Sequence, residues 1–199
     1  MNFLAHCLLA APEEGLMAGG VLGDFIKGPV PDDLPAELGA GIRLHRRIDS
    51  FSNRLPDMKV SVRRFGPELR RAAPVLLDIV ADRILAETWQ RYSDRAIGDF
   101  TSDVYAALAN HDDHVPVAGR RFVDYMVATD LLARYHEPEP IGRAARHVLE
   151  RLRMAHLVEP FAAAMDEQWA ALTRDFHVYF PRLQEFAAEE KHAIANSSR

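Results

Sequence analysis

The chain of 199 residues contains a single cysteine, Cys7, so no disulfide can form within it. A protein without disulfides fits a reducing compartment. The apolar run around Cys7, "FLAHCLLAA", has no basic segment before it and is interrupted by His6, which argues against a signal peptide. No stretch approaches the roughly 18 apolar residues that a membrane span requires. We therefore expect a cytoplasmic protein that does not enter a membrane.

The sequence also lacks the alternating apolar and polar residues of a half-buried β-strand, internal repeats and low-complexity segments. Apolar residues recur instead at helical spacing along almost the whole chain. This pattern predicts an all-α fold, a single-domain helical bundle over residues 1–199 with a frayed tail from about 190 to 199. The expected helices cover 2–11, 15–28, 36–53, 66–92 with a kink at Pro74, 96–111, 118–135, 141–156 and 159–189 with a break near Pro181.

The net charge of −5 argues against a general nucleic-acid binder. Basic residues nevertheless gather in one part of the chain, from 43 to 71, where only Asp49, Asp57 and Glu68 are acidic. A local basic surface on an acidic protein suits an acidic partner or a phosphorylated substrate, and solvated arginine-rich helix faces explain it equally well. The basic residues are Arg43, Arg46, Arg47, Arg54, Lys59, Arg63, Arg64, Arg70 and Arg71.

Two aspartates, Asp78 and Asp82, lie one turn apart on the most apolar of the expected helices. Burial and mutual repulsion both oppose ionisation of such a pair. Three arrangements would make the pair tolerable: one carboxyl keeps its proton, an arginine pairs with them, or a cation binds between them. We favour a metal or catalytic role over a buried ion pair.

Further chemistry-bearing residues lie on other expected helices. In "IRLHRRIDSF", residues 42–51, His45 and Asp49 lie one turn apart, between an apolar face and a face rich in arginine. Asp24 stands among apolar residues in "GVLGDFIKG", and His6 lies on the first helix, where a core histidine is an equally good interpretation.

Glycines precede Asp24 at three positions, Gly19, Gly20 and Gly23. Each costs roughly 1 kcal/mol relative to alanine inside a helix, so we expect them to permit the close approach of another backbone or a ligand. Together these positions suggest a site for a divalent cation, with Mn²⁺ or Mg²⁺ favoured over a closed structural zinc site. The proposed constellation is His6, Asp24, His45, Asp49, Asp78 and Asp82.

The same residues carry a resemblance to a known family. "MNFLAHCLLA", "GDFIKG", "GIRLHRRIDSF", "RRAAPVLLDIVADRILAETW" and "VYFPRL" occur in order along nearly the whole chain. In this combination the chain resembles the acyl carrier protein phosphodiesterase family, also called acyl carrier protein hydrolase. The resemblance implies a helical fold distantly related to the HD-domain metal phosphohydrolases. It also implies an Mn²⁺-favoured hydrolysis that removes 4′-phosphopantetheine from the serine of holo-acyl carrier protein, a reaction of lipid metabolism.

The resemblance assigns roles to the matching positions, since the acidic and histidine residues of the family correspond to Asp24, His45, Asp49, Asp78 and Asp82. The chain departs from the family pattern at Arg83, where members often have a histidine. The metal ligands would come from His6, Asp24, His45, Asp78 and Asp82, with Mn²⁺ preferred and Mg²⁺ as the alternative. Asp24, His45 and Asp49 would be catalytic, with Asp49 orienting the imidazole of His45. The phosphoryl group and the acidic carrier would be bound by Lys27, Arg43, Arg46, Arg47, Arg63 and Arg64.

Two alternatives remain at this stage. One is an HD-like hydrolase of a small nucleotide, and the other is a non-catalytic helical adaptor that binds the carrier and pairs its carboxylates with internal arginines. The polar stretch "NHDDH", residues 110–114, is interpreted as a solvated loop before Pro116 and not as a metal site.

Overall fold

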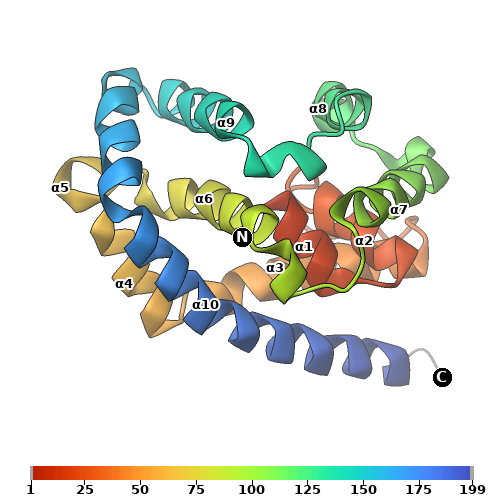
Figure 1. Cartoon of the computed structure of the whole chain (residues 1–199). Helices are drawn as coiled ribbons and strands as arrows, with labels where there is room; N and C mark the ends of the chain where they lie inside the picture. The colour runs from red at the N-terminus through yellow and green to blue at the C-terminus, as the bar shows by residue number, and fades with distance from the viewer. Residues whose placement is uncertain (1, 198–199) are drawn as a thin grey trace.

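Helices follow the apolar periodicity throughout the computed structural model, which describes residues 2–197 and has no β-strand in that range (Figure 1). The predicted all-α fold is confirmed. None of the helices within 2–197 combines the length and apolar character that a bilayer span requires. The α-helices are α1 Phe3–Ala10, α2 Glu14–Leu22, α3 Ala36–Ser52, α4 Pro56–Arg64, α5 Gly66–Leu69, α6 Ala73–Glu87, α7 Ile97–Asn110, α8 Val117–Ala128, α9 Pro138–Arg151 and α10 Val158–Ser197. Short 3-10 turns are η1 Trp89–Arg91, η2 Asp112–His114, η3 Ala133–His136 and η4 Ala155–Leu157.

The central helix is α6, which lies between α9 and α10 in Figure 1. It packs against α1, α4, α9, α10 and η3, and side chains all around it, such as Leu76, Val80 and Ile84, are completely buried. A polar residue that lies on a buried face of such a helix needs a partner from within the protein. Asp82 is the fully buried acid of α6 and accepts backbone N–H groups of α1.

Helices α2 and α3 approach each other through glycine. A Cβ atom built on Gly19 would lie 2.5 Å from the carbonyl carbon of Gly41, and one on Gly41 would lie 2.7 Å from the carbonyl oxygen of Gly15. On the side facing α1, a Cβ on Gly20 would lie 3.3 Å from the backbone of His6. The predicted close approach at these glycines is confirmed, and it brings α1, α2 and α3 together at backbone distance.

Several helix ends differ from the prediction. The segment 15–28 is not one helix, because α2 ends at Leu22 and Asp24 stands in the following turn. The segment 66–92 divides into α5, α6 and η1, and Pro74 occupies the first turn of α6, where its missing N–H is tolerated. The segment 118–135 likewise divides into α8 and η3.

The predicted break of the last helix is also wrong, whereas the fraying of the tail stays a prediction. Helix α10 continues through Pro181, since the flanking Phe180 and Leu183 are fully buried and hold it against the core. It runs on to Ser197 because its end makes distant contacts: Glu190 is buried and pairs with Arg47. Residues 198–199 of the predicted tail lie outside the described residues.

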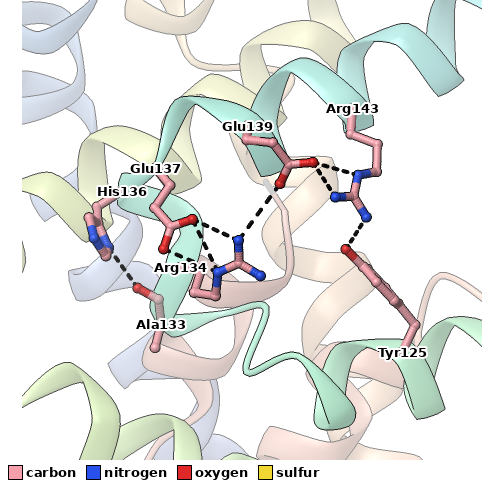
Figure 2. Close-up of polar contacts among 7 residues, drawn as sticks. All are labelled: Tyr125, Ala133, Arg134, His136, Glu137, Glu139 and Arg143. Atoms are coloured by element: carbon pink, nitrogen blue, oxygen red, sulfur yellow. Dashed lines mark hydrogen bonds and ion pairs between the residues drawn. The ribbon is translucent and has the colours of Figure 1, made fainter.

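A surface network joins α8 to α9 (Figure 2). Arg134 lies 2.7 Å from Glu137 and 3.8 Å from Glu139, and Arg143 bridges Glu139 to the hydroxyl of Tyr125 on α8. Exposed pairs of this kind each contribute little to stability. Within this network, the contact of Arg143 with the Tyr125 hydroxyl is the link between α9 and α8.

Candidate metal and active site

Two buried histidines face each other between α1 and α3. The rings of His6 and His45 stack with their centroids 3.9 Å apart, and the two residues are only 1% and 4% exposed. The space for the His45 ring exists because Gly23 has no side chain: a Cβ there would lie 2.6 Å from that ring. The absence of a side chain at Gly23, at the end of α2, therefore allows the His45 ring to stack on His6.

The hydrogen bonds of His45 determine which of its ring nitrogens carries the proton. Its Nδ1 lies 2.9 Å from the carbonyl oxygen of Gly20, which can only accept, so Nδ1 is the donor. The other ring nitrogen, Nε2, faces two carboxylates, Asp49 Oδ2 at 3.4 Å and Asp24 Oδ1 at 3.7 Å. Either a proton on Nε2 or a cation between these groups makes this arrangement favourable. An imidazole held through its other nitrogen in this way is the usual arrangement of a metal ligand.

His6 and Asp49 form the second half of the cluster. His6 Nε2 lies 3.0 Å from Asp49 Oδ1, while His6 Nδ1 is buried and has no hydrogen-bond partner within the described part of the chain. Burial, and then the proximity of His45, lowers the pKa of His6 to about 3, so the ring is neutral. Burial alone would raise the pKa of Asp49, but the hydrogen bond from His6 holds it well below its usual range. A neutral imidazole thus contacts a firmly ionised carboxylate.

These three side chains fit a divalent cation. One ligand atom each from His6, His45 and Asp49 can be chosen so that all lie within 4.8 Å of one another. Two imidazole nitrogens and a carboxylate oxygen suit borderline divalent ions such as Mn²⁺, whereas Mg²⁺ prefers ligands that are all oxygen. In residues 2–197 this is the one group of histidines and acids close enough to hold an ion.

Asp24 stands at the edge of the cluster, next to an open cavity. Its side chain is 44% exposed, and it lines a hollow of about 400 Å³ together with His45, Asp49, Lys27 and Arg46. The hollow opens the histidine cluster to molecules from solvent. Asp24 can therefore contact both a bound ion and a substrate.

The two aspartates of α6 differ, although they share a helix face. Asp82 is fully buried, and its oxygens accept the backbone N–H groups of Leu4 and Ala5 at 2.8 and 3.0 Å. It is absent from the histidine cluster, so the structure gives this predicted ligand a different set of partners. Asp78 is half-buried, and burial, with the charges of Asp49 and Asp24 nearby, raises its pKa. Asp78 is therefore the α6 carboxylate that belongs to the surroundings of the site.

Three of the predicted substrate-binding arginines are occupied within the protein. Arg46 donates to the carbonyl oxygens of Ile26 and Gly28 at 2.6 and 2.7 Å. Arg47 pairs with the buried Glu190 at 2.6 Å. The remaining one, Arg64, makes a two-pronged contact with Asp175 on α10, at 2.6 and 3.0 Å.

The other three predicted substrate-binding cations remain available. Lys27, Arg43 and Arg63 are exposed, and none has an ion pair with any residue in 2–197. Lys27 lines the cavity, and Arg43 lies beside Val30 at the end of the same loop. Lys27 is therefore an exposed cation of the cavity itself, whereas Arg43 lies on α3 and Arg63 on α4.

Arg83 and the stretch 110–114 both make contacts away from the histidine cluster. Arg83 pairs with Glu87 at 2.8 Å and stacks over Trp169 at 4.4 Å, so its contacts are with α6 and α10. The stretch 110–114 forms no metal-binding group among the described residues, and Asp112 pairs there with Arg120.

Sequence reasoning missed the partners that hold the site in place. No sequence pattern indicates that the Gly20 carbonyl accepts the hydrogen bond from His45 Nδ1. An aromatic cluster of Phe3, Phe25 and Phe122 packs α1, the turn after α2 and α8 together beside the site. The run of glycines before Asp24 was the one available signal.

Comparison with known proteins gives consistent relatives. The sequence profile of a family described as "Acyl carrier protein phosphodiesterase" matches residues 1–183. The chain is 29% identical over 195 residues to the acyl carrier protein phosphodiesterase of Escherichia coli O6:H1, covering 96% of this chain and 99% of that protein. It is 30% identical over 187 residues to the protein of the same name from Enterobacter sp. (strain 638), covering 92% and 95%. No solved structure matches the chain, so the relation to HD-domain phosphohydrolases stays a prediction.

Proposed function

Because the chain belongs to the acyl carrier protein phosphodiesterase family, we propose that it cleaves the phosphodiester between 4′-phosphopantetheine and the serine of holo-acyl carrier protein. The products would be apo-carrier protein and free 4′-phosphopantetheine. The observation that carries the proposal is Nε2 of His45, which faces two carboxylates at the edge of an open cavity. Imidazole and carboxylate groups gathered in this way could hold the cation of a metal-assisted phosphodiesterase.

We assign a different role in the reaction to each residue of the cluster and of the adjoining cavity. His6, His45 and Asp49 would hold a divalent cation, with Mn²⁺ favoured and Mg²⁺ as the alternative. A cation bound there neutralises charge on the phosphoryl group and lowers the pKa of a water molecule. Asp24, whose side chain is exposed at the cavity, would take a proton from the attacking water at its carboxylate. Lys27, which lines the same cavity, would bind a phosphoryl oxygen.

The carrier protein would dock around the cavity. Lys27 and Arg43 are exposed and have no internal ion pair within 2–197. Lys27 lines the cavity, and Arg43 on α3 lies near Val30 of the loop that follows α2. Unpaired cations attract an acidic partner without the cost of breaking an internal pair. Arg46, Arg47 and Arg64 would support this surface indirectly, through the contacts already described. We place the reaction in the cytoplasm on the strength of the single cysteine.

The decisive experiment is a mass measurement on the carrier. Incubation of holo-carrier with the protein and Mn²⁺ should lower the mass of the carrier by one phosphopantetheine, and a chelator should prevent the loss. A His45→Ala variant that remains helical by circular dichroism should be inactive. An unchanged carrier, with phosphate released from nucleotides instead, would favour the nucleotide hydrolase. No turnover of either substrate and no bound metal would favour the adaptor.

A further inference from the structure

Asp82 connects two helices that are far apart in the sequence. Its carboxylate, completely buried on α6, accepts one hydrogen bond from the N–H of Leu4 at Oδ2 and one from the N–H of Ala5 at Oδ1. Each carboxylate oxygen thus contacts the first turn of α1. Both bonds require acceptors, so the side chain must present two oxygens there.

The first turn of α1 needs this partner. The first N–H groups of any helix have no acceptor within the helix, and a side chain at the N-cap position usually supplies one. Asn2 occupies that position here and makes no such bond. Asp82 supplies both acceptors from another helix.

His6 follows Ala5 directly in the chain. Its ring must lie parallel to that of His45 at 3.9 Å and place Nε2 3.0 Å from Asp49. His45 has its own anchor in the Gly20 carbonyl, but no hydrogen bond within the described residues anchors the other ring nitrogen of His6. The position of the His6 ring therefore depends on where the first turn of α1 is held.

We propose that Asp82 is a positioning residue: it caps α1 from α6, fixes His6 in the metal cluster and does not itself bind the metal. The part of this inference that concerns the metal rests on the proposed function, whereas the capping of α1 and its effect on the His6 ring do not. Partners that orient metal ligands typically change metal affinity by about 10- to 100-fold when removed.

The first test follows the histidine rings in the metal-free protein by NMR. Asp82→Asn keeps the shape of the side chain but leaves only one acceptor for two N–H groups. The ring signals of His6 should shift, while those of His45, anchored by Gly20, should move much less. Unmoved His6 signals in a folded Asp82→Asn protein would overturn the inference.

A matched control separates positioning from a general loss of stability. Asp175 on α10 is a partly buried carboxylate that likewise joins two helices, since it accepts hydrogen bonds from Ser61 and Arg64 on α4. Asp175→Asn should lower thermal stability and leave the His6 ring signals in place. If it moved them as much as Asp82→Asn does, the shift would report destabilisation and the proposed role of Asp82 would fail.

The second test measures Mn²⁺ binding by calorimetry and turnover of holo-carrier. Asp82→Asn should weaken Mn²⁺ binding about 10-fold, and excess Mn²⁺ should restore much of the activity without a change in KM for the carrier. A metal ligand behaves differently, because its loss is not rescued in this way. An Asp82→Asn protein that binds Mn²⁺ as poorly as His45→Ala would show that Asp82 is a ligand.

Hydrogen exchange on the unaltered protein covers the case in which Asp82→Asn does not fold. The amides of Leu4 and Ala5 should exchange slowly although they belong to a first helical turn. Gly98 and Asp99 occupy the equivalent turn of α7, have no such cap and should exchange rapidly. Equal rates in the two turns would contradict the cap. Neither this measurement nor the NMR experiment uses the carrier, so the cap and the proposed function can fail separately.

Discussion

The chemistry of the site depends on one ring nitrogen, His45 Nε2, and on a neighbouring position without a side chain, which leaves room for the His45 ring. Gly23 provides that space at the end of α2, and its backbone is in the ordinary right-handed region (φ −55°), so alanine is allowed there conformationally. The clash with the ring is therefore the main consequence of adding a methyl group at this position.

Gly23→Ala should displace the His45 ring and lower Mn²⁺ affinity and turnover by about 10- to 100-fold, because a metal ligand tolerates little misplacement. Calorimetry and the carrier mass assay would measure both. Gly98→Ala is the matched control, since a Cβ at Gly98 in α7 meets nothing within 4 Å. It should leave both quantities unchanged and stabilise its helix slightly. Normal Mn²⁺ binding in Gly23→Ala would contradict the role of this glycine.

The protonation of His6 predicts a pH dependence of stability. In the unfolded chain a histidine titrates near pH 6.5, but burial and the neighbouring His45 lower the folded pKa of His6 to about 3. Between these two pH values His6 is protonated in the unfolded chain but neutral in the folded protein. The free energy of unfolding therefore falls as the pH falls through this window, by about 1 kcal/mol per pH unit.

Denaturant unfolding of the metal-free protein from about pH 7 to pH 4 would measure this slope. In His6→Gln the free energy of unfolding should fall less steeply as the pH falls, because the variant lacks the imidazole that is protonated only in the unfolded chain. Asp82 acts in the opposite sense, since burial raises its pKa to about 7 and acidification therefore favours the folded state. This opposing contribution is present in both proteins and cancels in the comparison. Identical slopes would show that His6 does not control this transition.

At the scale of elements, the turn between α2 and α3 carries Asp24 and Lys27, and Arg46 ties this turn to α3. Its guanidinium spans two carbonyl oxygens at once, those of Ile26 and Gly28. A lysine carries a single ammonium group and cannot reproduce this fork.

Arg46→Lys should therefore loosen the turn, raise its susceptibility to limited proteolysis and lower kcat/KM by about 10-fold through misplacement of Asp24 and Lys27. Proteolysis followed by mass spectrometry would locate the cleavage. Arg43→Lys, an exposed cation on the same helix with no ion pair in 2–197, should leave proteolysis unchanged. Equal resistance of the two variants would mean that Arg46 does not hold the turn.

The elements also show how far the sequence could predict the fold. Apolar periodicity located α1, α3 and α7 within a residue or two, because their own sequences carry the pattern of buried side chains. The path of α10 through Pro181 could not be read in the same way, since it depends on packing against distant parts of the chain. Helix ends set by tertiary contacts have no local signature.

The candidate site divides along the same line. The types of residue and their one-turn spacing pointed to imidazoles and carboxylates around a cation, and His6, His45 and Asp49 do lie together. The spacing of Asp78 and Asp82 could not show that one lies near the cluster while the other caps α1. That distinction depends on which backbone packs against α6, and this is a property of the docked helices.

At the scale of the whole molecule, internal pairing decides which charges can receive a partner. Arg47 and Arg64 are bound to acids of α10, whereas Lys27 and Arg43 remain exposed without ion pairs in 2–197, and Lys27 lines the cavity. Cations that are already paired contribute little to the attraction of an acidic partner, because a new contact must break the old one. Docking should therefore depend on Lys27 and Arg43.

A double variant, Lys27→Glu with Arg43→Glu, should weaken binding of apo-carrier by about 10-fold at low salt, and the difference should shrink as added salt screens the charges. Apo-carrier is the right probe because it lacks the phosphoryl group that Lys27 would contact during turnover. Arg146→Glu with Arg151→Glu changes the net charge equally on the exposed side of α9 and should bind almost normally. If both double variants lost affinity alike, the attraction would come from net charge, and docking beside the cavity would be wrong.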